Sequence, residues 1–295
     1  NIRSISYAKY GYFFILPFFL VYCFFQLWPL INTFILSVYG NGKKVDEFIG
    51  LGNFQALLFG TGMGRTASAI HETFFQTLGN TFIVWVGNFI PQIILSLALA
   101  VWFTDAKLKI RGKGFFKVVM YMPNIITAAS VAALFLSLFA ESKYGPINNL
   151  LLSAGLIDAP IKFVTGVWQS RGMIMFIQCW MWFGNTMIML MSGIMGLNPS
   201  LFEAANIDGA SSGQIFWKIT LPMVSSMILV NIVYTVIDFF LKTDNTVMDR
   251  IDAIGIGGRM DYGQASAMAW VYFLCVIVAL GIVSLIISRR VYYYE

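Results

Sequence analysis

Six apolar stretches dominate this chain, and each is long enough to cross a lipid bilayer as a helix. A membrane-spanning helix needs about 20 mostly apolar residues. Stretches of this kind occupy residues 11–37, 78–103, 116–139, 173–197, 223–241 and 265–287. The sequence therefore predicts an all-α, polytopic membrane protein with a bundle of six transmembrane helices.

The overall composition leads to the same fold class. Of the 295 residues, 58% are hydrophobic and only 11% are charged, whereas soluble domains have about 25% charged residues. No polar block is long enough for a separate soluble domain, so we expect residues 1–295 to form a single transmembrane domain. The basic residues stand beside apolar stretches instead of forming a dense stripe, which argues against a nucleic-acid partner.

The distribution of positive charge predicts the orientation in the membrane. Cytoplasmic loops of membrane proteins carry an excess of Lys and Arg. The loop after the second stretch and the C-terminal tail carry such an excess, at Lys107, Lys109, Arg111, Lys113, Lys117, Arg289 and Arg290. This places both termini in the cytoplasm, together with the loop between the fourth and fifth stretches. Charges nearly balance in the outward loops, at 39–77, 140–172 and 242–264.

A polar segment at residues 198–222, between the fourth and fifth stretches, has the signals of two short helices. Asn198 can cap a helix whose first residue is a proline. Gly209 can end that helix, because glycine adopts the left-handed conformation at little cost. Ser211 and Gln214 have the spacing of a capping box, so a second helix is predicted to begin there. We expect a helix, a turn and a second helix.

This segment also resembles the EAA loop of type I ABC importer permeases. The pattern is Glu-Ala-Ala, three residues, Gly, nine residues, then Ile-x-Leu-Pro, and it is matched at Glu203, Ala204, Ala205, Gly209, Ile219, Leu221 and Pro222. With Phe216 included, it resembles the carbohydrate branch of that family, the maltose-type permeases. The resemblance implies a six-transmembrane-helix type I ABC permease bundle with a cytoplasmic coupling helix. The alternative is a surface helical hairpin in an unrelated membrane protein.

Four shorter segments resemble the same carbohydrate permeases. They are Gly50-Leu-Gly-Asn-Phe54, Asn80-Thr-Phe82, Gly145-Pro-Ile-Asn-Asn149 and Tyr262-Gly-Gln-Ala-Ser-Ala267. Together with the 198–222 segment they extend the resemblance over nearly the whole chain.

The resemblance implies a coupling role for the 198–222 segment. In the family this loop sits in a groove of an ATPase subunit and moves with it, which implies ATPase-coupling roles for Glu203, Ala204, Ala205, Asp208 and Gly209. Small side chains let a partner surface approach the backbone, and the carboxylate of Glu203 offers a charge to a basic partner residue.

The chain carries no signal of its own for catalysis or for binding ATP. No Gly-x-x-x-x-Gly-Lys-Ser/Thr motif is present to hold nucleotide phosphates. The one histidine, His71, lacks the second histidine of a zinc-protease helix, and we expect it on the surface of an outward loop. The cysteines, Cys23, Cys179 and Cys275, have no metal-ligand spacing. We therefore expect no cofactor or metal on this chain, with ATP and Mg bound by separate ATPase subunits.

The fourth stretch carries the residue types that a sugar site needs. Sugars bind to aromatic platforms and a few convergent polar groups. This stretch offers both, at Gln178, Trp180, Trp182, Phe183 and Asn185. The resemblance places sugar contacts in this part of the helix, where Trp180 matches a family tryptophan and Asn185 replaces an aromatic residue. Alternatively, these side chains face lipid or pack inside the bundle.

The fifth stretch carries an acid, Asp238, well inside an apolar run. A carboxylate there costs on the order of 2.5–3.5 kcal/mol near the membrane centre, so it should face a cavity or a partner. The resemblance places Asp238 and Phe239 near another sugar-contacting segment. Alternatively, Asp238 pairs with Lys242, four residues on. Asn231 is a weaker candidate.

Taken together, these features predict a permease subunit of an ATP-driven, binding-protein-dependent sugar importer that works by alternating access, with an oligosaccharide as the favoured substrate. The partners implied are a second permease forming a heterodimer, two ATPase subunits and an extracytoplasmic sugar-binding protein. The location implied is the bacterial cytoplasmic (inner) membrane. The alternatives are a membrane-embedded enzyme, a channel or a secondary transporter and, within the family, a permease for glycerol phosphate or another polyol.

Overall fold

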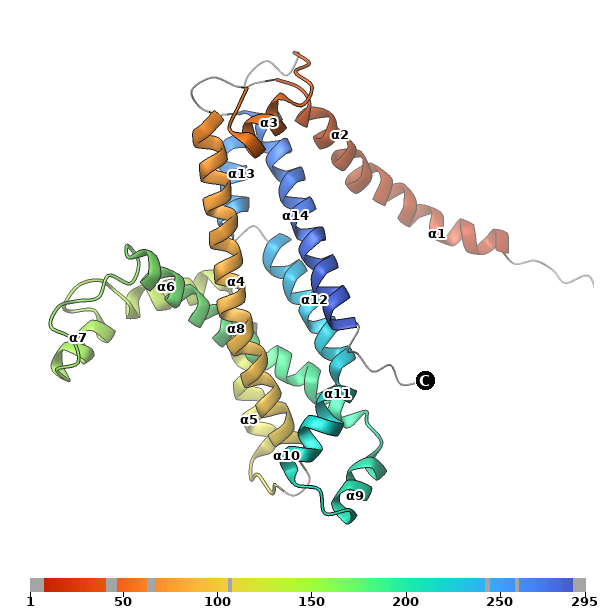
Figure 1. Cartoon of the computed structure of the whole chain (residues 1–295), viewed down its shortest axis with the longest axis vertical. Helices are drawn as coiled ribbons and strands as arrows, with labels where there is room; N and C mark the ends of the chain where they lie inside the picture. The colour runs from red at the N-terminus through yellow and green to blue at the C-terminus, as the bar shows by residue number, and fades with distance from the viewer. Residues whose placement is uncertain are drawn as a thin grey trace, which may run out of the picture. The chain divides into compact units, whose positions relative to one another are not determined.

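The computed structural model describes residues 8–40, 47–62, 67–105, 108–241, 245–257 and 260–288. Within them the secondary structure is helical, apart from one isolated bridge between Tyr39 and Phe48 (Figure 1). This confirms the all-α prediction. The chain divides into two compact units, Asn1–Gly79 with Lys242–Ile277, and Asn80–Leu241 with Val278–Glu295. Four of the charges named above, Lys107, Lys242, Arg289 and Arg290, lie outside the described residues.

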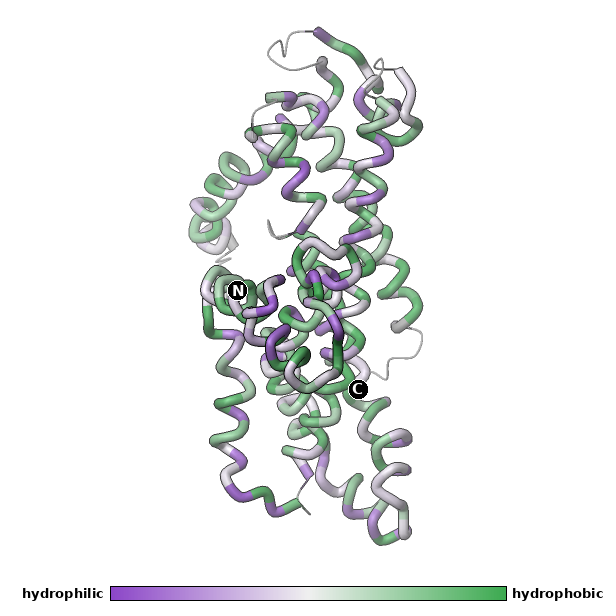
Figure 2. The backbone as a smooth tube through the Cα atoms, turned by 90° about the vertical axis from the view of Figure 1, so that its left-hand side faces the viewer, coloured by the Kyte–Doolittle hydropathy of each residue, from purple (hydrophilic) through white to green (hydrophobic). Residues whose placement is uncertain are grey.

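Five of the predicted membrane stretches correspond to long apolar helices. Hydrophobic residues occupy most of their length, as Figure 2 shows. The first is α1 (Ala8–Tyr22) and α2 (Trp28–Ser37), joined by a π-helical segment, Cys23–Leu27. The others are α4 (Ala67–Thr104), α8 (Val167–Met195), α12 (Ser225–Leu241) and α14 (Tyr262–Ser288). Short helices lie between them: α3 (Gly52–Phe59), α7 (Pro146–Ser153) and α13 (Thr246–Gly255).

The prediction of one continuous helix over 116–139 was wrong. The stretch forms α5 (Lys113–Tyr121), a 3-10 turn and α6 (Ala128–Leu138), and the two parts are bent by 94°. Pro123 lies in the 3-10 turn, Ile126 is extended, and the hydroxyl of Thr127 caps a new helix by accepting from the amide of Ser130. A proline lacks the amide that helix continuation needs, so these residues end one helix and begin another.

Two prolines in the chain follow wide helical turns. Pro29 comes two residues after the π-helical segment Cys23–Leu27, and Pro222 two residues after the π-helical segment Phe216–Thr220. A proline inside a regular α-helix collides with the carbonyl four residues earlier and leaves it without a donor. A π turn, in which hydrogen bonds span five residues, lets the helix continue through each proline.

In the first unit, two of the short motif segments meet. The side-chain amide of Asn53 on α3 donates to the carbonyls of Ser37 and Tyr39 at 2.9 Å each, which ties α3 to the end of α2. Gly263, at the start of α14, lies against the same place, because a side chain there would collide with the Tyr39 carbonyl. The segments 50–54 and 262–267 therefore form one local contact.

The second unit is built on close packing between α4 and α8. Gln92 of α4 donates to the hydroxyl of Thr186 at 2.8 Å, and the hydroxyl of Ser96 donates to the carbonyl of Phe183 at 2.7 Å. Below these bonds lies an apolar core formed by Ala100, Phe103, Met187, Leu190, Met191, Ile194 and Val224. Gly184 is needed on the opposite side of α8, because any Cβ there would overlap the carbonyl oxygen of Met120.

The connection from α6 to α8 is held by two polar side chains. Buried Asn148 donates to the carbonyls of Ala140 and Ile161 and accepts from the amide of Ile161. The carboxylate of Glu141 accepts from the amides of Thr165 and Val164 at 2.6 and 2.7 Å. These bonds, the one from Thr165 first, lower the pKa of Glu141 below its ordinary value. These bonds therefore hold the connection between α6 and α8 in one conformation.

The tight approach at Gly184 generates a stability prediction. We expect Gly184→Ala to destabilise the purified permease by about 1–3 kcal/mol, since the added methyl must displace the α5 backbone. Gly172→Ala on the same helix is the matched control. It has open space around it and should be neutral or stabilising by up to about 1 kcal/mol. Thermal unfolding in detergent measures both, and equal midpoints would contradict this packing.

Candidate functional site

The 198–222 loop has the helix, turn and helix that its sequence predicts. The side chain of Asn198 caps α9 (Pro199–Ile207) by accepting from the amide of Ser200. Gly209 ends that helix with a left-handed φ of 75°. Ser211 and Gln214 form a complete capping box at the start of α10 (Ser212–Ile215). The capping signals were therefore sufficient to locate both helices.

The second helix of the loop differs from the prediction in one respect. It continues as the π-helical segment Phe216–Thr220 and as α11 (Leu221–Met223), and then passes into α12 through Val224. The amide of Val224 still bonds to the carbonyl of Thr220. The loop is therefore joined to α12 by hydrogen-bonded helical turns.

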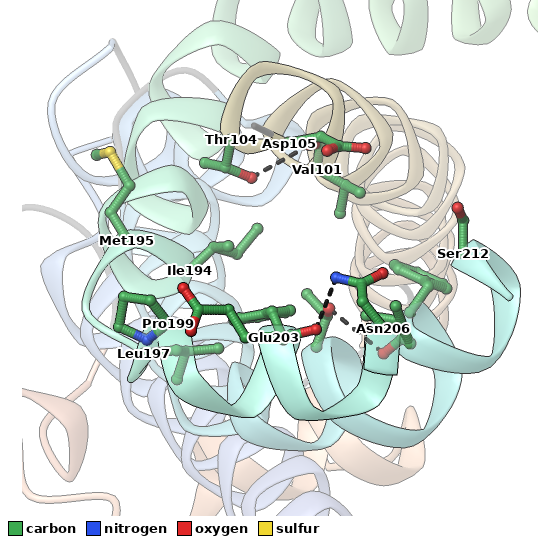
Figure 3. A pocket seen from close by; sticks show the side chains of 14 residues that line it. Val101, Thr104, Asp105, Ile194, Met195, Leu197, Pro199, Glu203, Asn206 and Ser212 are labelled. Carbon is green, nitrogen blue, oxygen red and sulfur yellow. Dashed lines mark hydrogen bonds between the residues drawn. The ribbon is translucent and has the colours of Figure 1, made fainter. Parts of the chain in front are cut away.

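A cavity of about 420 Å³ lies between this loop and the ends of α4 and α8. Figure 3 shows Thr104, the last residue of α4, and Asp105, which follows it, on one side and Glu203 and Asn206 of α9 on the other. The remaining walls are mainly apolar: Val101, Ile194, Met195, Leu197, Pro199, Phe202, Ser212, Ile215, Phe216 and Thr220. The structure thus brings two carboxylates to one cavity, that of Glu203 on α9 and that of Asp105 just after α4.

The outer surface of the loop is open. Glu203, Ala204, Asp208 and Gly209 are exposed, and Ala205 is half-buried. No side chain would be crowded at Gly209, because nothing lies within 4 Å of a Cβ built there. The five coupling candidates therefore lie on a short, capped segment whose backbone a partner can approach.

Two exposed apolar side chains on this loop were missed by the sequence reasoning. Ile207 is 86% exposed and Trp217 is 67% exposed. Both side chains therefore stand on the exposed surface of the loop, where a partner could reach them. Their position in an otherwise polar segment was the signal that could have found them.

The sugar-site candidates of α8 are all half-buried, at Gln178, Trp180, Trp182, Phe183 and Asn185. The ring of Trp180 packs edge-on against Phe135 of α6 at 5.5 Å. The carbonyl of Phe183 is the acceptor for Ser96 of α4. The contact of Trp180 with Phe135 is therefore one that is expected if Trp180 packs inside the bundle, which is the alternative to a sugar contact.

The candidates of α12 lie beside an aromatic cluster. Asp238 and Phe239 are half-buried, and Phe239 packs edge-on against Phe240. Phe240 in turn contacts Trp85 and Phe82 of α4. Nearer the loop, the amide of buried Asn231 lies 3.5 Å from the sulfur of Met189, so α12 packs on α8 there.

Among the described residues no group of three or more His, Cys, Asp and Glu side chains could hold a metal ion. His71 was expected in a loop, but it lies on α4. Its Nδ1 is 2.9 Å from the carbonyl of Leu57 on α3. The ring is half-buried and joins two helices.

The fold and the 198–222 loop define a multi-pass permease subunit of a membrane transport system. The family model described as "binding-protein-dependent transport system inner membrane component" matches residues 12–293, and the chain belongs to this family.

Relatives and solved structures agree with this assignment. The lactose transport system permease protein LacF of Rhizobium radiobacter is 30% identical over 219 residues, covering 74% of this chain and 68% of LacF. The arabinooligosaccharides transport system permease protein AraP of Bacillus subtilis is 26% identical over 240 residues, covering 81% of this chain and 72% of AraP. A chain in the crystal structure of a bacterial ABC transporter involved in alginate import has the same fold. Its TM-score is 0.79 at 21% identity, with 95% of this chain and 96% of that chain covered.

The capping box generates a second prediction. Ser211→Ala removes the hydroxyl that accepts from the amide of Gln214, and this should cost about 1 kcal/mol of local helix stability. Ser212→Ala, one residue on, removes no cap and serves as the control. Hydrogen exchange of the amides of 212–220, followed by mass spectrometry, should accelerate in the first variant only. Equal exchange in both would show that the box does not stabilise the loop.

Proposed function

We propose that this chain is one transmembrane half of an ATP-driven, binding-protein-dependent sugar importer, and that an oligosaccharide is its substrate. The observation that carries the proposal is the 198–222 loop. It is a capped helical hairpin with an open outer face, it has the family's motif at Glu203, Ala204, Ala205 and Gly209, and it lies in a chain of this permease family. The whole chain acts as one transmembrane domain in this proposal.

The loop supplies a mechanical link to the energy source. The sequence contains no motif to hold ATP phosphates, so two ATPase subunits bind ATP and Mg, and this chain performs no hydrolysis. A rigid element moved by a partner transmits displacement to the helices joined to it. Hydrogen-bonded turns join the loop to α12, and the loop follows α8 directly, so both helices move with it.

Alternating access requires a second bundle. The five apolar helices and one bent pair found among the described residues form one wall of a pathway in this proposal, and a second, related permease forms the other in a heterodimer. An extracytoplasmic binding protein delivers the sugar. In this proposal the chain lies in the cytoplasmic membrane of a bacterial cell, with the 198–222 loop and both termini in the cytoplasm. The basic cluster around Lys109, Arg111 and Lys113 supports this orientation, because cytoplasmic loops carry an excess of Lys and Arg.

The names of the relatives favour sugars as the substrate class. LacF is named for lactose and AraP for arabinooligosaccharides. The proposed site residues are Gln178, Trp180, Trp182, Phe183 and Asn185 of α8 together with Asp238 and Phe239 of α12. Glycerol phosphate is the second candidate, because a permease for that substrate, UgpA of Agrobacterium fabrum, is 25% identical over 263 residues. Stimulation of the ATPase activity of the reconstituted complex by a panel of glycans and by glycerol phosphate, each with the binding protein, decides between them.

Gly209 provides the direct test of coupling. We expect Gly209→Trp to leave membrane insertion intact but to abolish copurification with the ATPase subunit and substrate-dependent ATPase stimulation, because the indole covers the docking surface. Gly155→Trp is the matched control, since Gly155 also has a left-handed φ, of 66°, and open space around it, but lies in the loop after α7. It should copurify normally. Unimpaired transport by Gly209→Trp would exclude this loop as the coupling element.

A further inference from the structure

Three of the proposed sugar residues of α8, Gln178, Trp182 and Asn185, form one stripe that extends toward the outer end of the helix. α8 is a continuous α-helix over Val167–Met195, so each residue advances by about 100°. On this geometry Arg171, Gln178, Trp182 and Asn185 fall within an arc of about 60°. Arg171 was not among the sequence candidates, yet it stands on the same face, about 16 Å above Trp182.

The position of this stripe relative to the neighbouring helices follows from two contacts. The Nε of Arg171 donates to the side-chain oxygen of Asn80 on α4 at 2.7 Å. Five turns further along the same face, Met189 contacts Asn231 of α12. The stripe therefore runs along the side of α8 that α4 borders at the outer end and α12 borders at the inner end.

The guanidinium of Arg171 is held in place by neutral groups. It lies 4.7 Å from the ring centre of Trp168, one turn earlier on α8, and its other contact is the amide oxygen of Asn80. Among the described residues no acidic side chain forms an ion pair with it. The side chain is half-buried, and a cation in such a place gains most from an anion that binds to its remaining N–H groups.

Asp238, the acid of the proposed site, lies too far from Arg171 to repel an anion bound there. Asp238 is seven residues beyond Asn231 on α12, about 10 Å along the helix, whereas Arg171 is eighteen residues beyond Met189, about 27 Å along α8. Because α8 and α12 run in opposite directions from the same loop, Asp238 is level with Trp182 and Arg171 lies further out. A substrate that reaches both must be longer than one sugar ring.

We propose that Arg171 binds the carboxylate of a uronate unit in an oligosaccharide that lies along this stripe, with Trp182 under a sugar ring deeper in the membrane. The inference rests on the proposed sugar function and narrows its substrate class to acidic oligosaccharides. Asn80 and Trp168 are positioning residues for the guanidinium, and the two Nη groups donate to the carboxylate.

The test compares two sugars that differ only in charge. A short oligogalacturonate and its carboxyl-reduced, neutral form of equal length are titrated into the permease complex with its ATPases in nanodiscs, with intrinsic tryptophan fluorescence as the readout. The wild type should bind the uronate at least about tenfold more tightly, as expected for charge-assisted hydrogen bonds. Arg171→Gln should remove this preference and leave the affinity for the neutral sugar unchanged, and Arg171→Lys should retain part of the preference.

A matched variant and a phosphate probe separate the outcomes. Lys162→Gln, which removes another outer cation that is exposed and off the stripe, should keep the full preference. Binding of both sugars without preference overturns the uronate assignment but leaves the proposed sugar function intact, whereas binding of neither contradicts the sugar function as well. An equal loss of both sugars in Arg171→Gln would make Arg171 a structural residue. Tighter binding of glycerol phosphate than of the uronate would make phosphate the recognised group and overturn the assignment.

Discussion

The contact between α4 and α8 is the interaction on which the second unit depends. In a bilayer the hydrophobic effect does not press helices together, so association needs close packing and hydrogen bonds between helices. The hydrogen bonds between α4 and α8 run from Gln92 to Thr186 and from Ser96 to the carbonyl of Phe183. Gly184 permits close packing on the other side of α8. Since α8 leads into the 198–222 loop and α4 ends at its cavity, the same contact positions both proposed functional regions.

Local sequence signals predicted the parts of the fold that are determined locally. Apolar length located five of the membrane helices, and the capping residues Asn198, Gly209 and Ser211 located the helices of the 198–222 loop because caps act within a few residues. The start of α4 at Ala67 was missed, since its first turns are polar and extend beyond the apolar stretch. The break after Pro123 was missed because hydrophobicity does not distinguish one straight helix from two bent ones.

The candidate site was harder to predict than the fold, because it depends on which face of a helix meets which neighbour. Residue types selected Trp180, but its ring contacts Phe135 of α6. Arg171 was passed over because it precedes the apolar stretch, although the unbroken helix aligns it with Gln178 and Trp182. Sugar binding by these residues stays a prediction, made from their residue types.

The π-helical segment Phe216–Thr220 sets the rotational phase between the loop and α12. One additional residue in a helical turn rotates everything beyond it by about 100°. The side of α12 that carries Asn231 toward Met189 is therefore determined by a turn inside the loop and not by α12 itself. In related chains, a gain or loss of one residue here would present a different stripe of α12 to α8 while leaving the composition of both helices unchanged. The number of residues in this π-helical segment thus determines which face of α12 meets α8, and a comparison of individual residues would overlook it.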